Sequence, residues 1–427
     1  MTTPPFQFLN SSSISRVAKN QSFDCRKILF FLTGLYFLTV FVSSFFMPYY
    51  ILFWQKPGEL ANGSLFADTR QTTSALECNR SGHDVLIANP CDPWKRPFDY
   101  PRIWMALAPL QIDQSHTVFL GILSGILFFT SAYFIIGFIN IPEVIVYLLI
   151  LLSPSVLLAV ERGNNDLIIF SLLALATFSI SSVQKKTNVF GYVVLFLAAV
   201  LKLYPIMALV VVLKEKGKRG TLIFISVFFT FLLYLFVIFN DIQRIVQVLP
   251  TIGNYFTYGI SVSFDIIEHV LTSKVGFFIE FLTLSSLLVL IFSIFRRRSY
   301  FGTAVEFENS QRGRVVSAGF LVGAGIYLGT YILGRNYDYR LIFLIFLVPQ
   351  LLIWIKDAGK YSISASAVLL GVIFSVWLSR WSQNLLYIDE IINFLLFLYF
   401  FVFFSKIFYQ RIWLDGLYPN IQSIYRK

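Results

Sequence analysis

Charged residues are scarce in this 427-residue chain, where Asp, Glu, Lys and Arg make up 13% of the total. A soluble domain typically carries about 25%. Apolar residues reach 57%, and 47 residues are Phe. A soluble core of this length would leave large apolar patches exposed to water. The composition therefore excludes a soluble enzyme and a disordered chain.

Cysteine and histidine are scarce too, with three residues of each. So few cysteines exclude a disulfide scaffold, and the lack of a CxxC pair argues against a metal centre. Cys78 and Cys91 share one polar stretch, so they can form a disulfide if that stretch faces an oxidising compartment. The sequence identifies no cofactor. No cluster of residues requires a metal ion, and the sequence does not decide whether a divalent metal takes part.

Long apolar runs, in contrast, recur along the whole chain. They cover about 27–47, 117–139, 143–160, 166–183, 188–213, 221–240, 276–295, 315–333, 341–355, 361–379 and 388–408. Each is close to the ~20 residues that a membrane-spanning helix needs. The runs are continuous, whereas a barrel would show short alternating segments. We expect one all-α polytopic membrane domain over 1–427, with about ten full spans plus a broken-helix hairpin.

The net charge of +11 favours cytoplasmic loops that face anionic lipid over a nucleic-acid-binding surface. Basic residues gather at 185–186, 214–219, 296–298, 356–360 and in the C-terminal tail. The positive-inside rule then places both termini in the cytoplasm, including a polar N-terminal tail (1–26) that we expect to be disordered. The polar segment 48–116 becomes an ordered non-cytoplasmic loop.

The run 188–213 has basic loops on both sides, so it must enter and leave on the same face. Pro205 lacks an amide donor and disfavours helix at Tyr204. We expect two half-helices that meet at Lys202–Pro205, because a bilayer tolerates broken helices where they are buried or line a cavity. The alternative is one long kinked helix whose Lys202 reaches the membrane surface.

Polar residues gather at four places that this topology puts on the outer side. The first is 83–104, which contains Asp84, Asp92 and Asp99 among several aromatics; the alternative there is an interfacial aromatic belt with incidental charges. The second is 161–166, Glu-Arg-Gly-Asn-Asn-Asp, whose charges at a span junction are costly unless paired or functional. Gly163 would let this backbone turn tightly. The alternative is helix capping by Asn165 or Asp166.

The third place is Lys202 at the hairpin apex, and the fourth is the turn 334–340. That turn contains Arg335, Asp338 and Arg340, which suit an oxyanion or a sugar, or else form an Arg–Asp pair across a short turn. Arg and Lys bind phosphate leaving groups, and a positioned carboxylate can deprotonate a hydroxyl. This combination is typical of transfer from a lipid-linked phosphate donor.

The order of these motifs resembles the GT-C superfamily of polyprenyl-phosphate-sugar-dependent glycosyltransferases. The nearest parallel is the bacterial polyprenol-phosphate-mannose-dependent mannosyltransferases. The matching motifs, in order, are Asp84, Asn89–Trp94, Tyr100-Pro101, Arg162–Asn164 with Asp166, and Lys202–Pro205 followed by a basic loop. The similarity defines a GT-C-like module over about 30–220, followed by variable spans over 221–427.

The resemblance implies a hexosyltransferase that moves a hexose from a polyprenyl-phosphate donor to a glycan or lipid acceptor, with inversion of the anomeric configuration. Mannose is the hexose that the resemblance favours. The site would face outward from a bacterial cell or inner membrane, in contact with membrane lipid and without nucleic acid. Asp84 would be the general base, with Asp92 and Asp99 as secondary candidates. The implied phosphate-binding residues are Arg162, Lys202, Arg335 and Arg340, and those that hold the sugar or the turn are Asn164, Asn165, Asp166 and Tyr204.

Two other classes fit parts of the sequence. A transporter or flippase for a lipid-linked glycan would use broken helices and intramembrane charges, although no inverted repeat is evident. It predicts no essential carboxylate in the outer loop. A non-enzymatic assembly subunit predicts that Asp84→Asn leaves function intact.

The hairpin makes a prediction about sidedness. A cysteine introduced by Leu203→Cys should react with a membrane-impermeant thiol reagent from the outer face, because the predicted apex points there. Lys186→Cys in a basic loop should react from the cytoplasmic face. Labelling of Leu203→Cys from the cytoplasmic face alone would overturn the hairpin.

Overall fold

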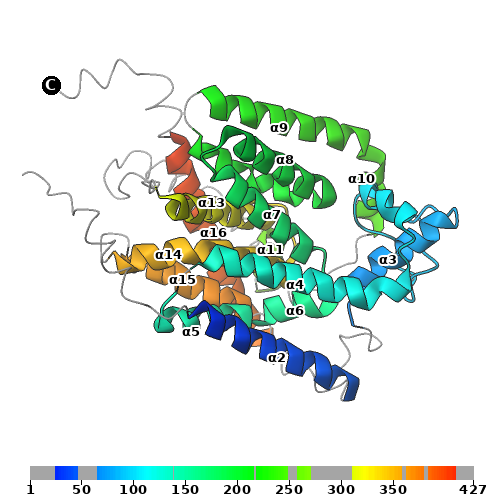
Figure 1. The fold of residues 1–427 in the computed structure, drawn as a ribbon, viewed down its shortest axis with the longest axis horizontal. Helices are drawn as coiled ribbons and strands as arrows, with labels where there is room; N and C mark the ends of the chain where they lie inside the picture. The colour runs from blue at the N-terminus through cyan, green and yellow to red at the C-terminus, as the bar shows by residue number, and fades with distance from the viewer. Residues whose placement is uncertain are drawn as a thin grey trace, which may run out of the picture.

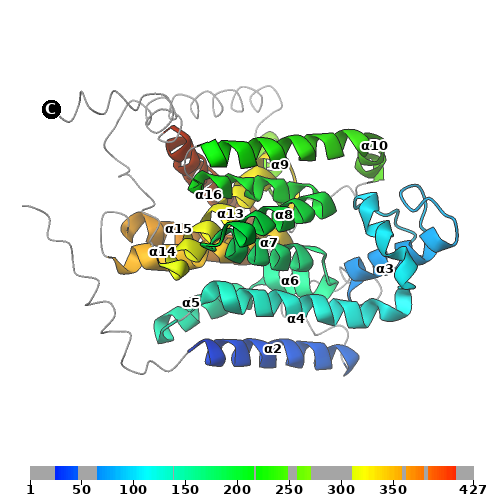
Figure 2. The ribbon, with the colours of Figure 1, turned by 45° about the horizontal axis from the view of Figure 1, so that its top comes forward.

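The computed structural model describes residues 25–46, 65–137, 139–215, 218–248, 257–270, 310–357, 362–378 and 383–409. Most helices lie side by side in a bundle, and a smaller group of short helices lies at one end (Figures 1 and 2). We call that group, residues 65–116, the cap. The first half of the described chain contains α2 (Arg26–Phe46), α3 (Ala67–Arg80), η2 (Arg102–Leu110), η3 (Gln114–His116), α4 (Thr117–Ile136), α5 (Ile141–Leu151), α6 (Pro154–Arg162), α7 (Asp166–Ile180) and α8 (Lys185–Lys202).

The second half adds further helices and two short strands that pair with each other. The elements are η4 (Tyr204–Lys214), α9 (Lys218–Val237), α10 (Phe239–Val248), β1 (Thr257–Tyr258), α11 (Ile260–Val270), α13 (Gln311–Ile332), β2 (Asn336–Tyr337), η5 (Asp338–Leu347), α14 (Val348–Lys356), α15 (Ser362–Trp377) and α16 (Gln383–Tyr409). The strands are antiparallel, with Thr257 opposite Tyr337 and Tyr258 opposite Asn336. This pairing fixes the segment before α11 against the turn before η5.

Within the described ranges, five helical segments are long and apolar enough to cross a membrane. They are Gln114–Ile136, Lys218–Val237, Gln311–Ile332, Asp338–Lys356 and Leu385–Phe408; α5 and α6, bent by 53°, make a sixth if they count as one span. Large apolar side chains lie on the surface of these helices, such as Phe236, which is 79% exposed. Lipid tolerates such a surface and water does not. The chain is therefore an all-α multi-pass membrane protein.

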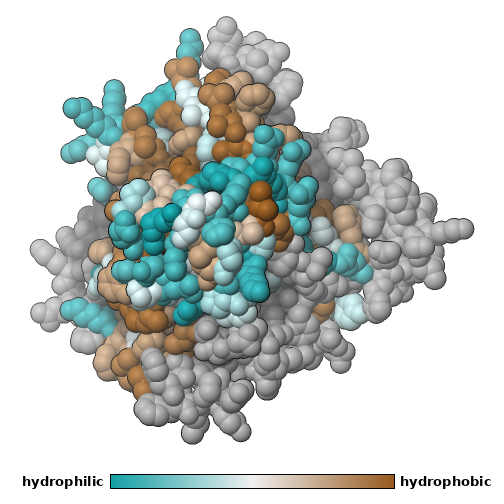
Figure 3. All heavy atoms as spheres, turned by 90° about the vertical axis from the view of Figure 1, so that its right-hand side faces the viewer, coloured by the Kyte–Doolittle hydropathy of each residue, from teal (hydrophilic) through white to brown (hydrophobic). Residues whose placement is uncertain are grey.

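The total of ten spans remains a prediction, because several predicted segments lie outside the described residues. These are the tail 1–24, the start of the polar segment at 47–64, the run 276–295 with the basic triplet at 296–298, and the C-terminal tail at 410–427. At the end of the bundle that carries the cap, hydrophilic side chains gather across the face, with hydrophobic patches around them (Figure 3).

Helix α13 lies at the centre of the bundle and packs closely through glycines. A Cβ at Gly323 would lie 2.8 Å from the carbonyl oxygen of Phe343, and one at Gly325 would lie 2.7 Å from that of Met207. Small residues let membrane helices approach to backbone contact. Segment η5 therefore packs against α13 at Gly323, and segment η4 packs against α13 at Gly325.

Basic side chains tie several helix ends together at the end of the bundle opposite the cap, which we call the basic end. Arg312 donates to the carbonyl oxygens of Ile135 at 2.7 Å and Ile136 at 2.6 Å, in the last turn of α4. Lys356 pairs with Glu143 at 2.7 Å. A cation at a helix C-terminus satisfies carbonyl groups that lack a partner within the helix.

The run 188–213 breaks where the sequence predicts. Helix α8 ends at Lys202, Leu203 has φ 62° and ψ −59°, and η4 begins at Tyr204. Asn188 near the start of α8 donates to Glu215 just beyond η4, at 3.0 Å. The chain therefore doubles back and leaves Lys202 at the turn, away from the basic end.

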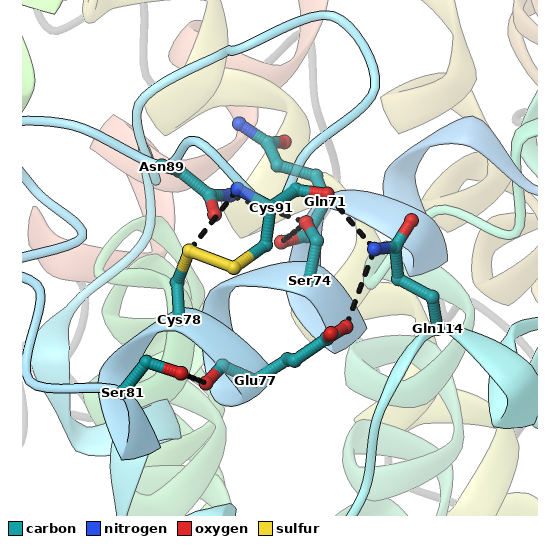
Figure 4. The surroundings of a disulfide bond; sticks show 8 residues. All are labelled: Gln71, Ser74, Glu77, Cys78, Ser81, Asn89, Cys91 and Gln114. Carbon is teal, nitrogen blue, oxygen red and sulfur yellow. Dashed lines mark hydrogen bonds between the residues drawn. A yellow bond between two sulfur atoms is a disulfide. The ribbon is translucent and has the colours of Figure 1, made fainter.

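The cap is held by a disulfide and its own small core. Cys78 in α3 is bonded to Cys91, and the Gln114 amide donates to the carbonyl oxygen of Cys91 at 2.8 Å and to Glu77 at 3.2 Å (Figure 4). Buried residues from α3, the following loop and η2 pack together, among them Leu76, Val85, Leu86, Phe98 and Trp104. The disulfide that the sequence allowed is thus formed.

Removing the disulfide should destabilise the cap. The bridge joins residues 13 positions apart, and a loop of this size corresponds to about 3 kcal/mol of unfolding free energy. Cys78→Ser with Cys91→Ser should lower stability by this order in detergent unfolding. Dithiothreitol should reproduce the loss in the wild type and leave the double variant unchanged; equal stability of all forms would contradict the prediction.

Candidate functional site

Asp68, in the first turn of α3, joins the cap to the bundle. Its buried carboxylate accepts hydrogen bonds from Arg162 Nε at 2.9 Å, Arg162 Nη2 at 2.6 Å and Asn164 Nδ2 at 2.6 Å. Burial by itself raises the pKa of Asp68, but the charge and hydrogen bonds of Arg162 outweigh it and hold the pKa below its usual value. Asp68 therefore stays ionised and well bonded.

The turn between α6 and α7 fits against α3 because it contains Gly163. This residue has φ 55°, and a Cβ there would collide with Thr69 Oγ1. The Thr69 hydroxyl donates to the Gly163 carbonyl oxygen at 2.7 Å. A left-handed conformation and a close neighbour both demand glycine.

The capping of α7 differs from the alternative that the sequence left open, in which Asn165 or Asp166 caps the helix. Asn164 Oδ1 accepts the backbone N–H of Asp166 at 2.9 Å, so Asn164 supplies the capping oxygen. Asn165 makes no capping bond and donates instead to Thr72 at 3.3 Å. Because Asn164 also donates to Asp68, one amide serves both the helix start and the contact with the cap.

A second buried carboxylate, Asp166, collects three groups from other elements. The Lys202 ammonium lies 2.7 Å from Asp166 Oδ1 and donates to Asn164 Oδ1 at 2.9 Å. The Tyr204 hydroxyl donates to the same Asp166 oxygen, and Arg340 Nε lies 3.8 Å from the other. A buried ion pair keeps its geometry when hydrogen bonds satisfy both partners. Asp166 thus fixes the ends of α8, η4 and η5 around the start of α7.

Tyrosine rings form the walls around these charges. The Lys202 ammonium lies 5.0 Å from the ring centroid of Tyr100 and 5.6 Å from that of Tyr339. Tyr337 stacks on Tyr339 with centroids 5.2 Å apart. Burial, with the charge of Asp99, raises the pKa of Tyr100 well above its usual value, so Tyr100 stays neutral. Rings in this arrangement attract a cation such as the Lys202 ammonium.

Asp99 differs from the other carboxylates of the cap. Its Oδ1 atom is buried and has no hydrogen-bond partner within the described chain. Burial, and then the nearby charge of Asp68, raise the pKa of Asp99 although Lys202 acts in the opposite direction. Asp99 therefore binds a proton more strongly than an ordinary Asp, which suits a general base.

Two guanidinium groups of the site keep donors that no described residue uses. Arg162 donates from Nε and Nη2 to Asp68, and its side chain is 32% exposed. Arg340 donates through Nη1 to Asn336, and its side chain is 23% exposed. The remaining N–H groups can bind an anion such as phosphate.

The structure gathers Arg162, Asn164, Asp166, Lys202, Tyr204, Arg340 and Asp99 in this region, as the sequence predicted. It places other predicted residues in separate contacts. Asp84 pairs with Arg102 and Arg244, Asp92 accepts from Arg96 at 2.9 Å, and Arg335 pairs with Asp265. Asp68 was not singled out from the sequence. The signal for Asp68 was weak: one acid in a polar stretch, with its partners 94 and 96 residues away.

Comparisons of the chain with protein-family models, with curated proteins and with solved structures give no match. Within the described ranges, no group of three or more His, Cys, Asp or Glu residues is arranged to hold a metal ion. The function of the protein must therefore be inferred from the side chains of the site.

Asp68→Asn should destabilise the protein, because it leaves the Arg162 charge without its partner. Since Arg162 is one-third exposed, we expect a loss of about 2–3 kcal/mol in unfolding free energy, at the lower end for buried pairs. The lowered pKa means that the wild type keeps this contribution above the unfolded pKa of about 4 and loses it as pH falls through the folded value.

Detergent unfolding between pH 7 and pH 3 checks both parts. Asp113→Asn is the control, because Asp113 is an exposed cap residue paired locally with His116, so its loss should be smaller. Wild-type stability in Asp68→Asn would contradict the role of this carboxylate.

Proposed function

We propose that the protein is an integral membrane glycosyltransferase that moves a hexose from a polyprenyl-phosphate donor to an acceptor hydroxyl. The observation that carries this proposal is that arginine N–H donors and a carboxylate oxygen without a partner lie in the same region. Arg162 and Arg340 offer unused donors, and Asp99, within reach of the charges of Lys202 and Asp68, offers an unbonded carboxylate oxygen. An anion site beside a base is what transfer from a phosphate-linked donor needs.

In this proposal the donor phosphate lies between Arg162 and Arg340. Their ion pairs with Asp68 and Asp166 hold both side chains in place before the substrate binds. Such preorganised charges stabilise a departing phosphate without rearranging during the reaction. Lys202 is bonded to Asp166 and Asn164, and in this proposal its charge acts on the phosphate at longer range.

Transfer then proceeds in one displacement. The acceptor oxygen attacks the anomeric carbon, the bond from that carbon to the phosphate oxygen breaks, and its electron pair leaves with the phosphate. The acceptor proton passes to the Asp99 carboxylate. Attack from the face opposite the leaving group inverts the anomeric configuration, and the transition state is oxocarbenium-like.

We infer Asp99 as the base in preference to Asp84, which the family resemblance favours. Asp84 is bonded to two arginines, at 3.0 Å and 2.8 Å, so each of its carboxylate oxygens already has a cationic partner. Asp92 is held by Arg96 and by the backbone N–H groups of Trp94 and Arg96. Asp99 has the free oxygen and the raised pKa.

The finer topology belongs to the same proposal. The basic end, by the positive-inside rule, faces the cytoplasm, so the cap and the site face outward. The Cys78–Cys91 disulfide supports this side, because disulfides persist in oxidising compartments. The proposal also includes a GT-C-like arrangement of about ten spans plus the hairpin, with both termini in the cytoplasm. The membrane would be a bacterial cell or inner membrane, and the donor sugar would be mannose.

One observation favours the alternative of a transporter or flippase. Asp389 and Glu390 are both buried in α16, and neither Asp389 oxygen has a hydrogen-bond partner within the described chain. Ser263 donates to Glu390 at 2.9 Å. Acids inside membrane helices mark ion or proton pathways by default. A flippase would move a lipid-linked glycan across vesicles without forming a glycosylated product.

The base assignment is tested with labelled sugar on a polyprenyl-phosphate donor. Asp99→Asn should lower turnover by about 10²–10⁴-fold, because general-base catalysis contributes this much, and Asp99→Glu should keep part of it. Because a base works deprotonated, the raised pKa should move the acid limb of the kcat/KM profile above that of an ordinary Asp.

Asp113→Asn serves as the matched cap control and should turn over normally. Normal turnover in Asp99→Asn together with complete loss in Asp84→Asn would return the role to Asp84. Glycan translocation without any transfer by the purified wild type would replace the transferase with the flippase.

A further inference from the structure

Helix α10 lies against the cap with little apolar packing. None of its ten residues, all of which the structure describes, is fully buried, and Phe239 and Val246 are mostly exposed. Ile245 packs, partly buried, against the small core of the cap. Because apolar contact stabilises in proportion to the area removed from water, this packing cannot by itself fix the position of α10.

Four alternating charges join α10 to the cap instead. Arg102 Nη2 lies 3.0 Å from Asp84 Oδ1, and Arg102 Nε lies 3.1 Å from Asp241 Oδ2. Arg244 Nη1 lies 2.8 Å from Asp84 Oδ2. Single exposed ion pairs are weak, but pairs that share partners act together. Asp84 is the shared partner of both arginines, one on each carboxylate oxygen.

The same cap segment reaches the functional site. Arg102 lies between Tyr100 and Trp104 in sequence, and the Trp104 indole N–H donates to the carbonyl oxygen of Leu201 at 3.0 Å. The next residue, Lys202, faces the ring of Tyr100 at 5.0 Å. A displacement of Arg102 would therefore move the two aromatic side chains that contact the end of α8.

We propose that Asp84, Arg102, Asp241 and Arg244 form an ionic latch through which α10 positions Tyr100 and Trp104 against Lys202. Asp84 is then a positioning residue of the donor site. The kinetic part of this inference rests on the proposed transferase function, whereas the structural part does not.

Hydrogen–deuterium exchange of the full-length protein tests the structural part without any substrate. In Arg244→Gln, which removes one ion pair outside the site, amides of segments 98–108 and 198–206 should exchange severalfold faster. Arg244→Lys should restore slow exchange, because Arg244 uses one nitrogen toward Asp84. Arg219→Gln breaks an ion pair with Glu215 near the basic end and is the control, with no change in either segment. Faster exchange confined to α10 would overturn the latch.

Steady-state transfer kinetics test the positioning role of Asp84. Asp84→Asn and Arg244→Gln should share one phenotype, a donor KM raised about tenfold with little change in kcat, as loss of ground-state binding predicts. Loss of kcat in Asp84→Asn with normal kinetics in Arg244→Gln would overturn the role and indicate a base. If the wild type shows no transfer, the proposed function fails, and the exchange experiment still decides the latch.

Discussion

The structure depends on two buried carboxylates, Asp68 and Asp166, that a single amide connects. Asn164 donates to Asp68, accepts from Lys202, and accepts the backbone N–H of Asp166. Asp68 binds the cap to the turn after α6, and Asp166 binds the ends of α8 and η5 to the start of α7. In a low-dielectric interior a carboxylate without partners is costly, so each one fixes the cations around it. The candidate site is the region where both buried carboxylates find the cations that they need.

The need to pair buried carboxylates divides the charged groups of the site into two sets. One set forms the ion pairs that hold the structure together, and the other keeps atoms that can interact with a substrate. Asp68 is held by Arg162 and Asn164, and Asp166 Oδ1 is held by Lys202 and Tyr204, so both carboxylates anchor the elements around them. Asp99 lies nearby with an oxygen that no described group uses. Arg162 and Arg340 are held on one side by carboxylates and keep N–H groups on the other. Chemistry is therefore expected from the groups that the packing leaves incompletely satisfied.

Much of this region could be predicted from the sequence, because its signals are local. Pro205 with the flanking basic residues predicted the break at Lys202, and the charges compressed into Glu161–Asp166 marked the junction between helices. Other features had no local signal. Asp68 stands in a polar stretch that looks like any solvated helix, and its partners are 94 and 96 residues away. Asp84 matched a family motif, but its contact with Arg244 spans 160 residues, and no pattern within the cap could reveal it.

By itself, the sequence determined that the chain is an all-α membrane protein, that the run 188–213 breaks at Lys202–Pro205, and which segments carry charges that lipid cannot solvate. These properties follow from hydrophobicity and backbone chemistry, which act over a few neighbouring residues. The tertiary structure decided which carboxylate pairs with which cation, and so which acid remains free to accept a proton. Pairing over long sequence distances depends on how the helices pack, because a charge interacts with whatever the fold brings within a few ångströms of it.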